Sequence, residues 1–188
     1  MSKTLTPTVA TPADAELAYQ SAQTVVEVHR RVSAWLKVGV TLGQVDQFVA
    51  RTLEDLGCRS CFYRYKPHRS PAFPSHACLS VNDCVVHGTA GSCTRPMKPG
   101  DLLKIDIGIV KNGWIGDAGW TYAFKEVSPE VKRLMDAGKE SLRRGVTAMK
   151  PGNLLLAWAQ EVQEHVEHEC GFHLIRGLGG HGTIGRSL

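Results

Sequence analysis

The stretch that decides the fold is "IDIGIVKNGWIGDAGWTY", residues 105–122, in which Asn112-Gly113 separates two runs of alternating residues. An Asn-Gly pair between such runs is the strongest short-range signal for a β-hairpin with a two-residue turn. Asp106 lies in the first run and Asp117 in the second, among residues otherwise suited to burial. The sequence therefore predicts two neighbouring strands that each carry one aspartate.

The predicted turn also fixes which residues face each other across the hairpin. Asp106 is expected to pair with Gly119 and Asp117 with Gly108, which makes the aspartates diagonal neighbours with backbones about 7 to 8 Å apart. On the opposite face, four residues are expected to point into a core: Ile105, Ile107, Ala118 and Trp120.

Two carboxylates held on one face repel each other unless a cation lies between them. Catalysis by two metal ions about 3.5 to 4 Å apart needs such a pair of carboxylates, and the neighbouring glycines are expected to leave room for the ions. The hairpin therefore favours a dinuclear metal site. The alternative is that Asp106 and Asp117 are exposed or satisfied by hydrogen bonds.

The composition is that of an ordinary globular chain, with 188 residues, 43% hydrophobic, 21% charged, and a net charge of +4. This length suits one or two small cores. Neither a signal-peptide pattern nor an apolar run of the ~20 residues that span a bilayer is present, so a cytoplasmic location without a membrane partner is expected. The six cysteines are expected to be reduced, because a chain of this size does not need disulfides.

Two further motifs have weaker functional interpretations. Cys58-x-x-Cys61 has the spacing of half a zinc site or a redox pair, but no second such pair follows at zinc-finger spacing. A basic patch with interleaved aromatics is more often a solvated loop than a nucleic-acid site, so no DNA partner is expected. The patch consists of Arg59, Arg64, Lys66, His68 and Arg69.

An internal repeat indicates a duplicated fold. Residues 36–58 and 149–171 both begin with a Lys-x-Gly turn and continue as an amphipathic helix closed by a glycine. Another helical stretch precedes each copy, at about residues 15–35 and 129–147, and strand-like runs follow. This order predicts an α+β unit repeated once, with the second copy cut short. Residues 1–14 are expected to form a flexible arm.

Two histidines are candidates for the site by their context. His181 lies in "GLGGHGTIG", where little but the imidazole projects, and His87 precedes a glycine at the end of a strand-like run. Taken alone, either is more often an ordinary hydrogen-bonding loop histidine than a ligand. Three others are expected to be structural or solvated: His165, His168 and His173.

Four blocks of the chain together resemble the type I methionine aminopeptidases. The blocks are residues 73–90, 98–122, 138–153 and 179–188, in the family's order and at nearly its spacing. Four ordered blocks are far more specific than any one of them. The resemblance implies a catalytic domain over residues 15–188 with the pita-bread fold, in which two pseudo-symmetric halves surround a curved antiparallel sheet flanked by helices, the second half being incomplete here.

The resemblance also implies the chemistry. The family removes the initiator methionine from new polypeptides at a site with two divalent ions, of Co, Mn, Fe or Zn, through a water held between them. Three family ligands correspond to Asp106, the metal-bridging Asp117, and His181. The implied partners are nascent polypeptide N-termini, with the ribosome as a further candidate, and the intact protein is expected to be a monomer.

The resemblance assigns substrate contacts and shows departures. His87 corresponds to the family's substrate-contacting catalytic histidine, and Phe73, Cys78 and Leu188 fall at or near positions that line the methionine pocket. The family's second active-site histidine and two glutamate ligands would follow Leu188. The chain is therefore expected to be a truncated and inactive form, with an unpaired strand edge near residues 172–178.

Two alternatives remain at this point. A proline-specific Xaa-Pro aminopeptidase of the same fold keeps both aspartates and the histidine, although the block around residues 80–90 is closer to the methionine aminopeptidases. A non-catalytic binding protein with the pita-bread fold is the other alternative. Metal content and peptidase assays separate them.

Overall fold

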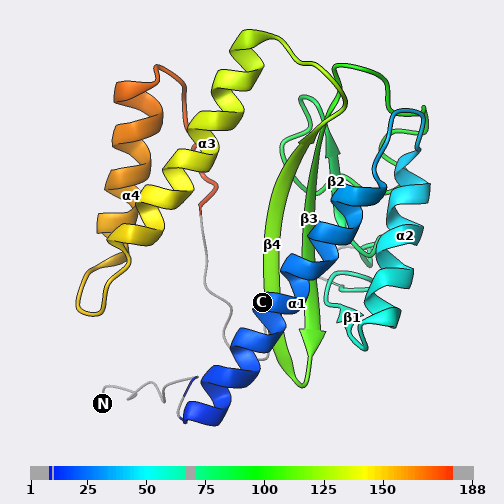
Figure 1. The fold of residues 1–188 in the computed structure, drawn as a ribbon, viewed down its shortest axis with the longest axis horizontal. Helices are drawn as coiled ribbons and strands as arrows, with labels where there is room; N and C mark the ends of the chain where they lie inside the picture. The colour runs from blue at the N-terminus through cyan, green and yellow to red at the C-terminus, as the bar shows by residue number, and fades with distance from the viewer. Residues whose placement is uncertain (1–8, 10, 67–70, 180–188) are drawn as a thin grey trace. The chain divides into compact units, whose positions relative to one another are not determined.

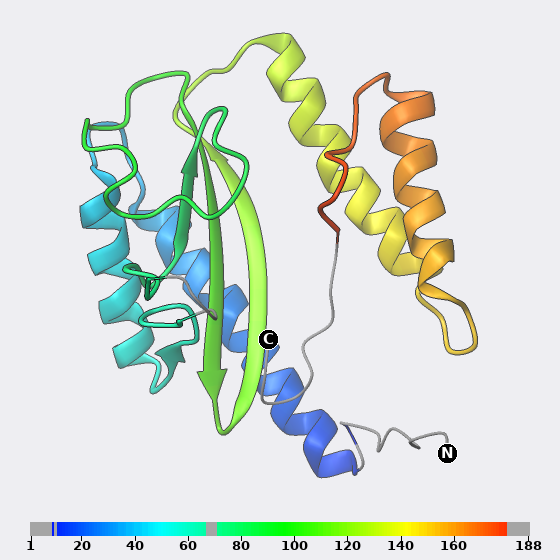
Figure 2. The same ribbon diagram turned by 180° about the vertical axis from the view of Figure 1, so that it is seen from behind.

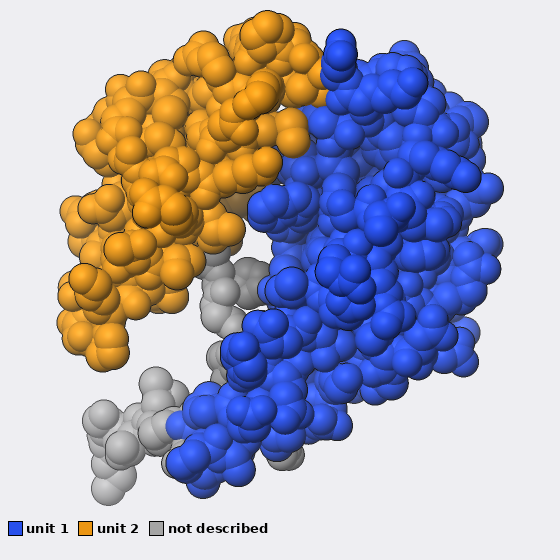
Figure 3. Space-filling view, viewed as in Figure 1, with its two compact units in different colours: residues 1–126, 182–188 blue, residues 127–181 orange. Residues whose placement is uncertain are grey.

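The computed structural model describes residues 9, 11–66 and 71–179. The chain divides into two units, residues 1–126 with 182–188 and residues 127–181, which are coloured separately in Figure 3. Among the described residues, no helix has the length and apolar character needed to cross a membrane.

The first unit begins with two helices that each start at a capping box. In α1 (Pro12–Trp35) the side chain of Thr11 accepts a hydrogen bond from the backbone of Asp14, and in α2 (Leu42–Asp55) Thr41 does the same for Gln44. Both predicted helices are confirmed. Because the cap and Pro12 start α1 early, residues 12–14 are helical rather than part of the arm.

The sheet of the first unit is antiparallel and is built around one long strand. Strand β3 (Leu102–Lys111) pairs with β4 (Trp114–Ala123) along its whole length. Its other edge pairs with β2 (Cys78–Val81) and with β1 (Arg59–Ser60). Figures 1 and 2 show this arrangement from opposite sides.

The hairpin has the predicted register. Lys111 pairs with Trp114, so that Asp106 lies opposite Gly119 and Asp117 lies opposite Gly108. Both turn residues have positive φ, 52° at Asn112 and 80° at Gly113, as a two-residue hairpin turn of this type requires. The predicted hairpin and its pairing are confirmed.

The core lies on the isoleucine face of the hairpin. Ile105, Ile107 and Ile109 are fully buried and belong to one cluster with valines and leucines of α1 and α2. The prediction that Trp120 points into this core is wrong, since 44% of the residue is exposed. Among the described strands, β4 pairs only with β3, and a large ring on such an edge strand can extend past the covering helix.

The described part of the second unit contains helices joined by turns and irregular segments, and no strand. Helix α3 (Pro129–Ala148) starts at the Ser128 cap as predicted, and α4 (Leu155–Gln163) continues into a short π-helix, η1 (Glu164–Glu169). The strand expected near residues 172–178 is not formed. A lone extended segment gains no ladder hydrogen bonds, and the described part of this unit offers no strand to pair with.

Candidate metal centre

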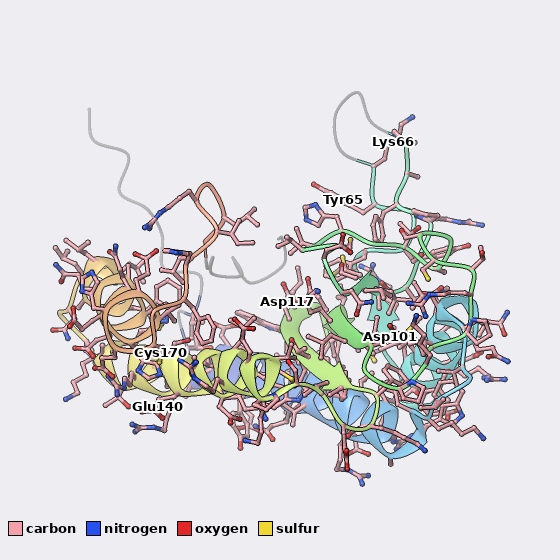
Figure 4. All side chains as sticks on the ribbon, turned by 90° about the horizontal axis from the view of Figure 1, so that it is seen from above. Tyr65, Lys66, Asp101, Asp117, Glu140 and Cys170 are labelled. Carbon is pink, nitrogen blue, oxygen red and sulfur yellow. The ribbon has the colours of Figure 1, made fainter. Side chains whose placement is uncertain are left out.

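The two aspartates of the hairpin lie on the same face of the sheet. Asp106 on β3 and Asp117 on β4 occupy diagonal positions in the register, and both are half-buried. Because side chains alternate along a strand, their face is the one opposite the isoleucine core. Figure 4 shows the sheet from above, with Asp117 labelled. The local sequence thus places both carboxylates on the side of the sheet that α1 and α2 do not cover.

The carboxylate of Asp117 fits a bound cation. Its Oδ1 is buried and has no hydrogen-bond partner, and it is the one buried side-chain oxygen or nitrogen of the described residues in that condition. A buried polar atom without a partner costs about 1 to 3 kcal/mol, and more when it is charged. A metal ion would satisfy this oxygen, so the residues present fit the expected metal.

Two thiols line the same face. Cys78 pairs with Asp106 in the register of β2 and β3, and the backbone N–H of Cys61 donates to Gly108 O at 3.0 Å. Burial raises the pKa of both thiols to about 12, with further contributions from the charges of Asp106 and Asp117. The thiols therefore stay protonated at neutral pH and provide an apolar wall rather than charged ligands.

Gly108 makes room for this wall rather than for metal ions. A Cβ at this position would overlap the Cys61 sulfur and lie 2.7 Å from Cε1 of Phe62. At Gly119 a Cβ would meet the Asp106 Cβ at an ordinary 3.7 Å. The expectation that both glycines leave space for the ions is therefore wrong for Gly108, whose missing side chain is replaced by neighbouring side chains.

His87 lies beside this wall in a strained backbone conformation. Its φ is 60°, which is uncommon for a residue other than glycine. The next residue is fixed to β2, since Gly88 N donates to Ser80 Oγ at 3.1 Å and Gly88 O accepts from Leu79 N at 2.8 Å. The backbone of His87 also hydrogen-bonds the Cys78 thiol, which lowers that thiol's pKa and so opposes the effect of burial. Such strain is a reason to assign a functional role to this histidine.

Phe73 connects to the hairpin through a second aromatic residue. The rings of Phe73 and Phe62 meet edge to face with centroids 6.3 Å apart, and Phe62 is also the residue that a side chain at Gly108 would strike. The sequence predicted Phe73 and Cys78 as pocket residues. It missed Phe62, and it treated Cys61 only as part of a Cys-x-x-Cys pair, because their proximity depends on the pairing of β1 with β3.

Other predicted site residues cannot be placed. His181 and Leu188 lie outside the described residues. Within the described part of the chain, no three histidine, cysteine, aspartate or glutamate side chains form a group able to hold a metal ion. The geometry therefore brings together two carboxylates of the expected centre and gives no support to a zinc site at Cys58 and Cys61.

Comparison with known proteins identifies the class to which this fold and this site belong. Residues 16–187 match metallopeptidase family M24, and the chain belongs to this family. It is 33% identical to methionine aminopeptidase 1 of Bacillus subtilis over 178 residues, covering 95% of this chain and 68% of that protein. The methionine aminopeptidase of Aquifex aeolicus is 32% identical, covering 90% of this chain and 65% of that protein.

Solved structures support the same relationship. The crystal structure of the methionine aminopeptidase from Thermotoga maritima superposes with a TM-score of 0.85 at 30% identity, covering 95% of this chain and 69% of that one. An X-Pro aminopeptidase of the same organism superposes with a TM-score of 0.70 at 17% identity, covering 87% of this chain and 42% of that one. The resemblance to the methionine aminopeptidases and the pita-bread α+β fold are thereby confirmed.

Proposed function

We propose that this chain acts in the removal of the initiator methionine from nascent polypeptides, with two divalent metal ions at the aspartate face of its hairpin. The observation that carries the proposal is the buried, unpartnered Oδ1 of Asp117 on the face shared with Asp106. The relatives named above are methionine aminopeptidases. Divalent ions at such a site activate a water as the nucleophile near neutral pH.

In this proposal the two ions would be held by Asp106, Asp117 and His181. Carboxylate and imidazole ligands bind Co, Mn, Fe and Zn alike. The ion that occupies such a site is therefore decided by metal availability. The assignment of His181 rests on the sequence alone.

The remaining residues of the face would bind and orient the substrate. His87 has an exposed side chain, and we assign it a hydrogen bond to the amide that is cleaved or to the charge that develops there. Phe62, Phe73 and the protonated thiols of Cys61 and Cys78 offer an apolar surface suited to the unbranched side chain of methionine. This surface would shield the bound methionine side chain from bulk water.

A peptidase assay tests the proposal. The chain spans about two thirds of its relatives' length, so we would assay it both alone and followed by the part of the Bacillus subtilis relative that it does not cover. Turnover of a Met-Ala-Ser peptide with added Co or Mn is expected to be highest in the extended form. Cleavage of Ala-Pro-Ala instead would favour a proline-specific peptidase.

Two substitutions separate ligand from substrate contact in the extended form. Asp117→Asn should abolish turnover, while Asp83→Asn, which changes an exposed aspartate, should not. His87→Ala should leave the metal content intact and lower kcat by about 100-fold or more, as expected for loss of a transition-state hydrogen bond. Full turnover in Asp117→Asn would overturn the assignment of this residue.

A further inference from the structure

A group of reactive side chains remains unexplained in the second unit, at the end of the π-helix η1. His165 is 7% exposed, and its Nδ1 lies 2.9 Å from Glu169 Oε2. The sulfur of Cys170 lies 3.6 Å from Nε2 of the same ring and 3.9 Å from Nδ1. A thiol, an imidazole and a carboxylate in this order are the components of an activated nucleophile.

The π-helix is what brings the thiol to the ring. The backbone N–H of Cys170 donates to His165 O at 3.0 Å, a bond that spans five residues. In a regular α-helix, residues five apart are rotated by about 140° around the axis and their side chains diverge. The wider π-turn instead places Cys170 over His165, and such turns are frequent at functional sites.

The carboxylate orients the ring. Arg144 Nη1 lies 2.6 Å from Glu169 Oε1, and this ion pair, followed by the hydrogen bond with His165, lowers the pKa of Glu169 to about 2. At neutral pH Glu169 is therefore a carboxylate, which only accepts hydrogen bonds. The proton of the neutral imidazole accordingly lies on Nδ1, and Nε2, the ring nitrogen nearer to the thiol, is left as an acceptor.

We propose that Cys170 is a site of reversible modification by small disulfides, with His165 as the base that takes the thiol proton. As the sulfur of Cys170 attacks one sulfur of the small disulfide, the thiol proton moves to Nε2 of His165. A new S–S bond forms to one half of the small disulfide while its own S–S bond breaks. The other half leaves as a thiolate and recovers the proton from His165. Cys170 is oxidised, and the small disulfide is reduced.

The charges around the group favour this step. From α3, Arg133 donates to Cys170 O at 3.2 Å, and Arg144 bridges Glu169 and Glu140. Glu169 stabilises the imidazolium that forms when His165 takes the proton, as the third group does in catalytic triads. By contrast, burial raises the pKa of Cys61 and Cys78 to about 12, so these two thiols should react slowly at neutral pH.

The test is the rate of mixed-disulfide formation at each cysteine of the whole chain. The chain is incubated with oxidised glutathione at pH 7, quenched with acid, and mapped by peptide mass spectrometry. Cys170 should react at least about tenfold faster than Cys93, which is also half-buried, because a positioned base accelerates such steps by roughly 100-fold or more. Added dithiothreitol should reverse the modification.

Matched variants show whether the ring acts as the base. His165→Gln and Glu169→Gln should each slow the reaction of Cys170 about tenfold at pH 7. His168→Gln is the control, since His168 lies 2.7 Å from Glu164 at the same spacing along the chain but contacts no thiol in the described structure.

Two results would overturn the proposal. One is a Cys170 that reacts no faster than Cys93 in the folded wild-type chain. The other is an unchanged rate at pH 7 in both His165→Gln and Glu169→Gln. Circular dichroism identifies a variant that fails to fold, and Glu169→Gln keeps the test decisive if the buried His165 cannot be replaced, because Glu169 is 43% exposed. These measurements need no metal and are independent of peptidase activity.

Discussion

The two units of the chain differ in how they bury apolar side chains. In the first unit, isoleucines of β3 and valines of α1 and α2 form a continuous core. In the second, the buried apolar residues are Ala137 and Val166 within its described part. Several large apolar side chains of the second unit are instead exposed: Leu134, Leu142, Val146, Met149, Leu154, Leu155, Leu156, Ile175 and Leu178.

The comparison gives a physical reason for the place of the proposed metal ligands. The hairpin that carries Asp106 and Asp117 belongs to the unit with its own core. Burial of its isoleucines, at about 25 cal/mol per Å² of apolar surface, can offset the cost of holding an unpartnered carboxylate oxygen. Helices α3 and α4 gain less free energy from burial, since amphipathic helices are stabilised mainly by packing their apolar faces and many apolar side chains of these helices are exposed.

The largest expected effect tests this difference in burial. Ile107→Ala in β3 should destabilise the chain by about 4 kcal/mol, because the side chain is fully buried and its loss leaves a cavity. Leu155→Ala, at a residue that is 74% exposed, should change stability by less than about 0.5 kcal/mol. Urea unfolding of both variants measures this. Similar losses would mean that the second unit depends on burial as much as the first.

The next largest effect concerns charge. Asp101, 2% exposed, accepts hydrogen bonds from Arg95 at 2.6 Å and 2.9 Å and from the backbone of Lys98 at 2.9 Å. Asp101→Asn should cost about 2 to 3 kcal/mol, because the buried carboxylate loses charge-assisted hydrogen bonds, although the Arg95 side chain left behind is 40% exposed. Asp136→Asn in α3, whose partner Lys132 is exposed, should cost less than about 0.5 kcal/mol. Chemical denaturation compares the two.

The same carboxyl makes a pH prediction. The Arg95 guanidinium holds the pKa of Asp101 well below its usual range. The folded state therefore binds this proton less readily than the unfolded state, whose pKa is about 3.9. The contribution of Asp101 is fully present above that value and is lost as the pH falls towards the folded pKa. Acid titration of unfolding should show a steeper loss below about pH 4 in wild type than in Asp101→Asn. Equal slopes would contradict the prediction.

A smaller effect is expected when a methyl group is added at a crowded glycine in each unit. A Cβ at Gly116 would lie 2.5 Å from the backbone oxygen of Ser21 in α1, and one at Gly145 would lie 2.5 Å from Cδ1 of Trp158. Gly116→Ala should cost about 2 kcal/mol, because helix backbone has to move. Gly145→Ala should cost less than Gly116→Ala, since the indole ring of Trp158 rather than helix backbone has to move and alanine favours the helix by about 1 kcal/mol. Thermal unfolding distinguishes them.

The sequence predicted most of the first unit because its signals are local. The Asn112-Gly113 turn sets the register of β3 and β4, and the threonine caps set the starts of α1 and α2. The neighbours of the aspartates could not be predicted in this way. Cys61 and Phe62 reach the face through the pairing of β1 with β3, and the left-handed backbone of His87 depends on the docking of Gly88 against β2. Such contacts join segments far apart in the chain.

The second unit was predicted less completely from the sequence. Its helices were predicted from caps and periodicity, but the strand near residues 172–178 and the π-turn that joins His165 to Cys170 were not foreseen correctly. A strand needs a partner, and a π-turn differs from an α-helix by a single hydrogen-bond shift that no residue pattern specifies. His165 was therefore predicted to be structural or solvated, and its contact with the thiol is seen only in the folded chain.

The central claim is that the hairpin aspartates bind divalent metal, and its most direct test is a thermal melt with and without Co²⁺. Wild type should melt at a higher temperature with metal, because a ligand that binds only the folded state stabilises it. Asp117→Asn should melt close to wild type without metal and show no increase when metal is added, while Asp83→Asn should respond as wild type does. An equal increase in Asp117→Asn and wild type would contradict the claim.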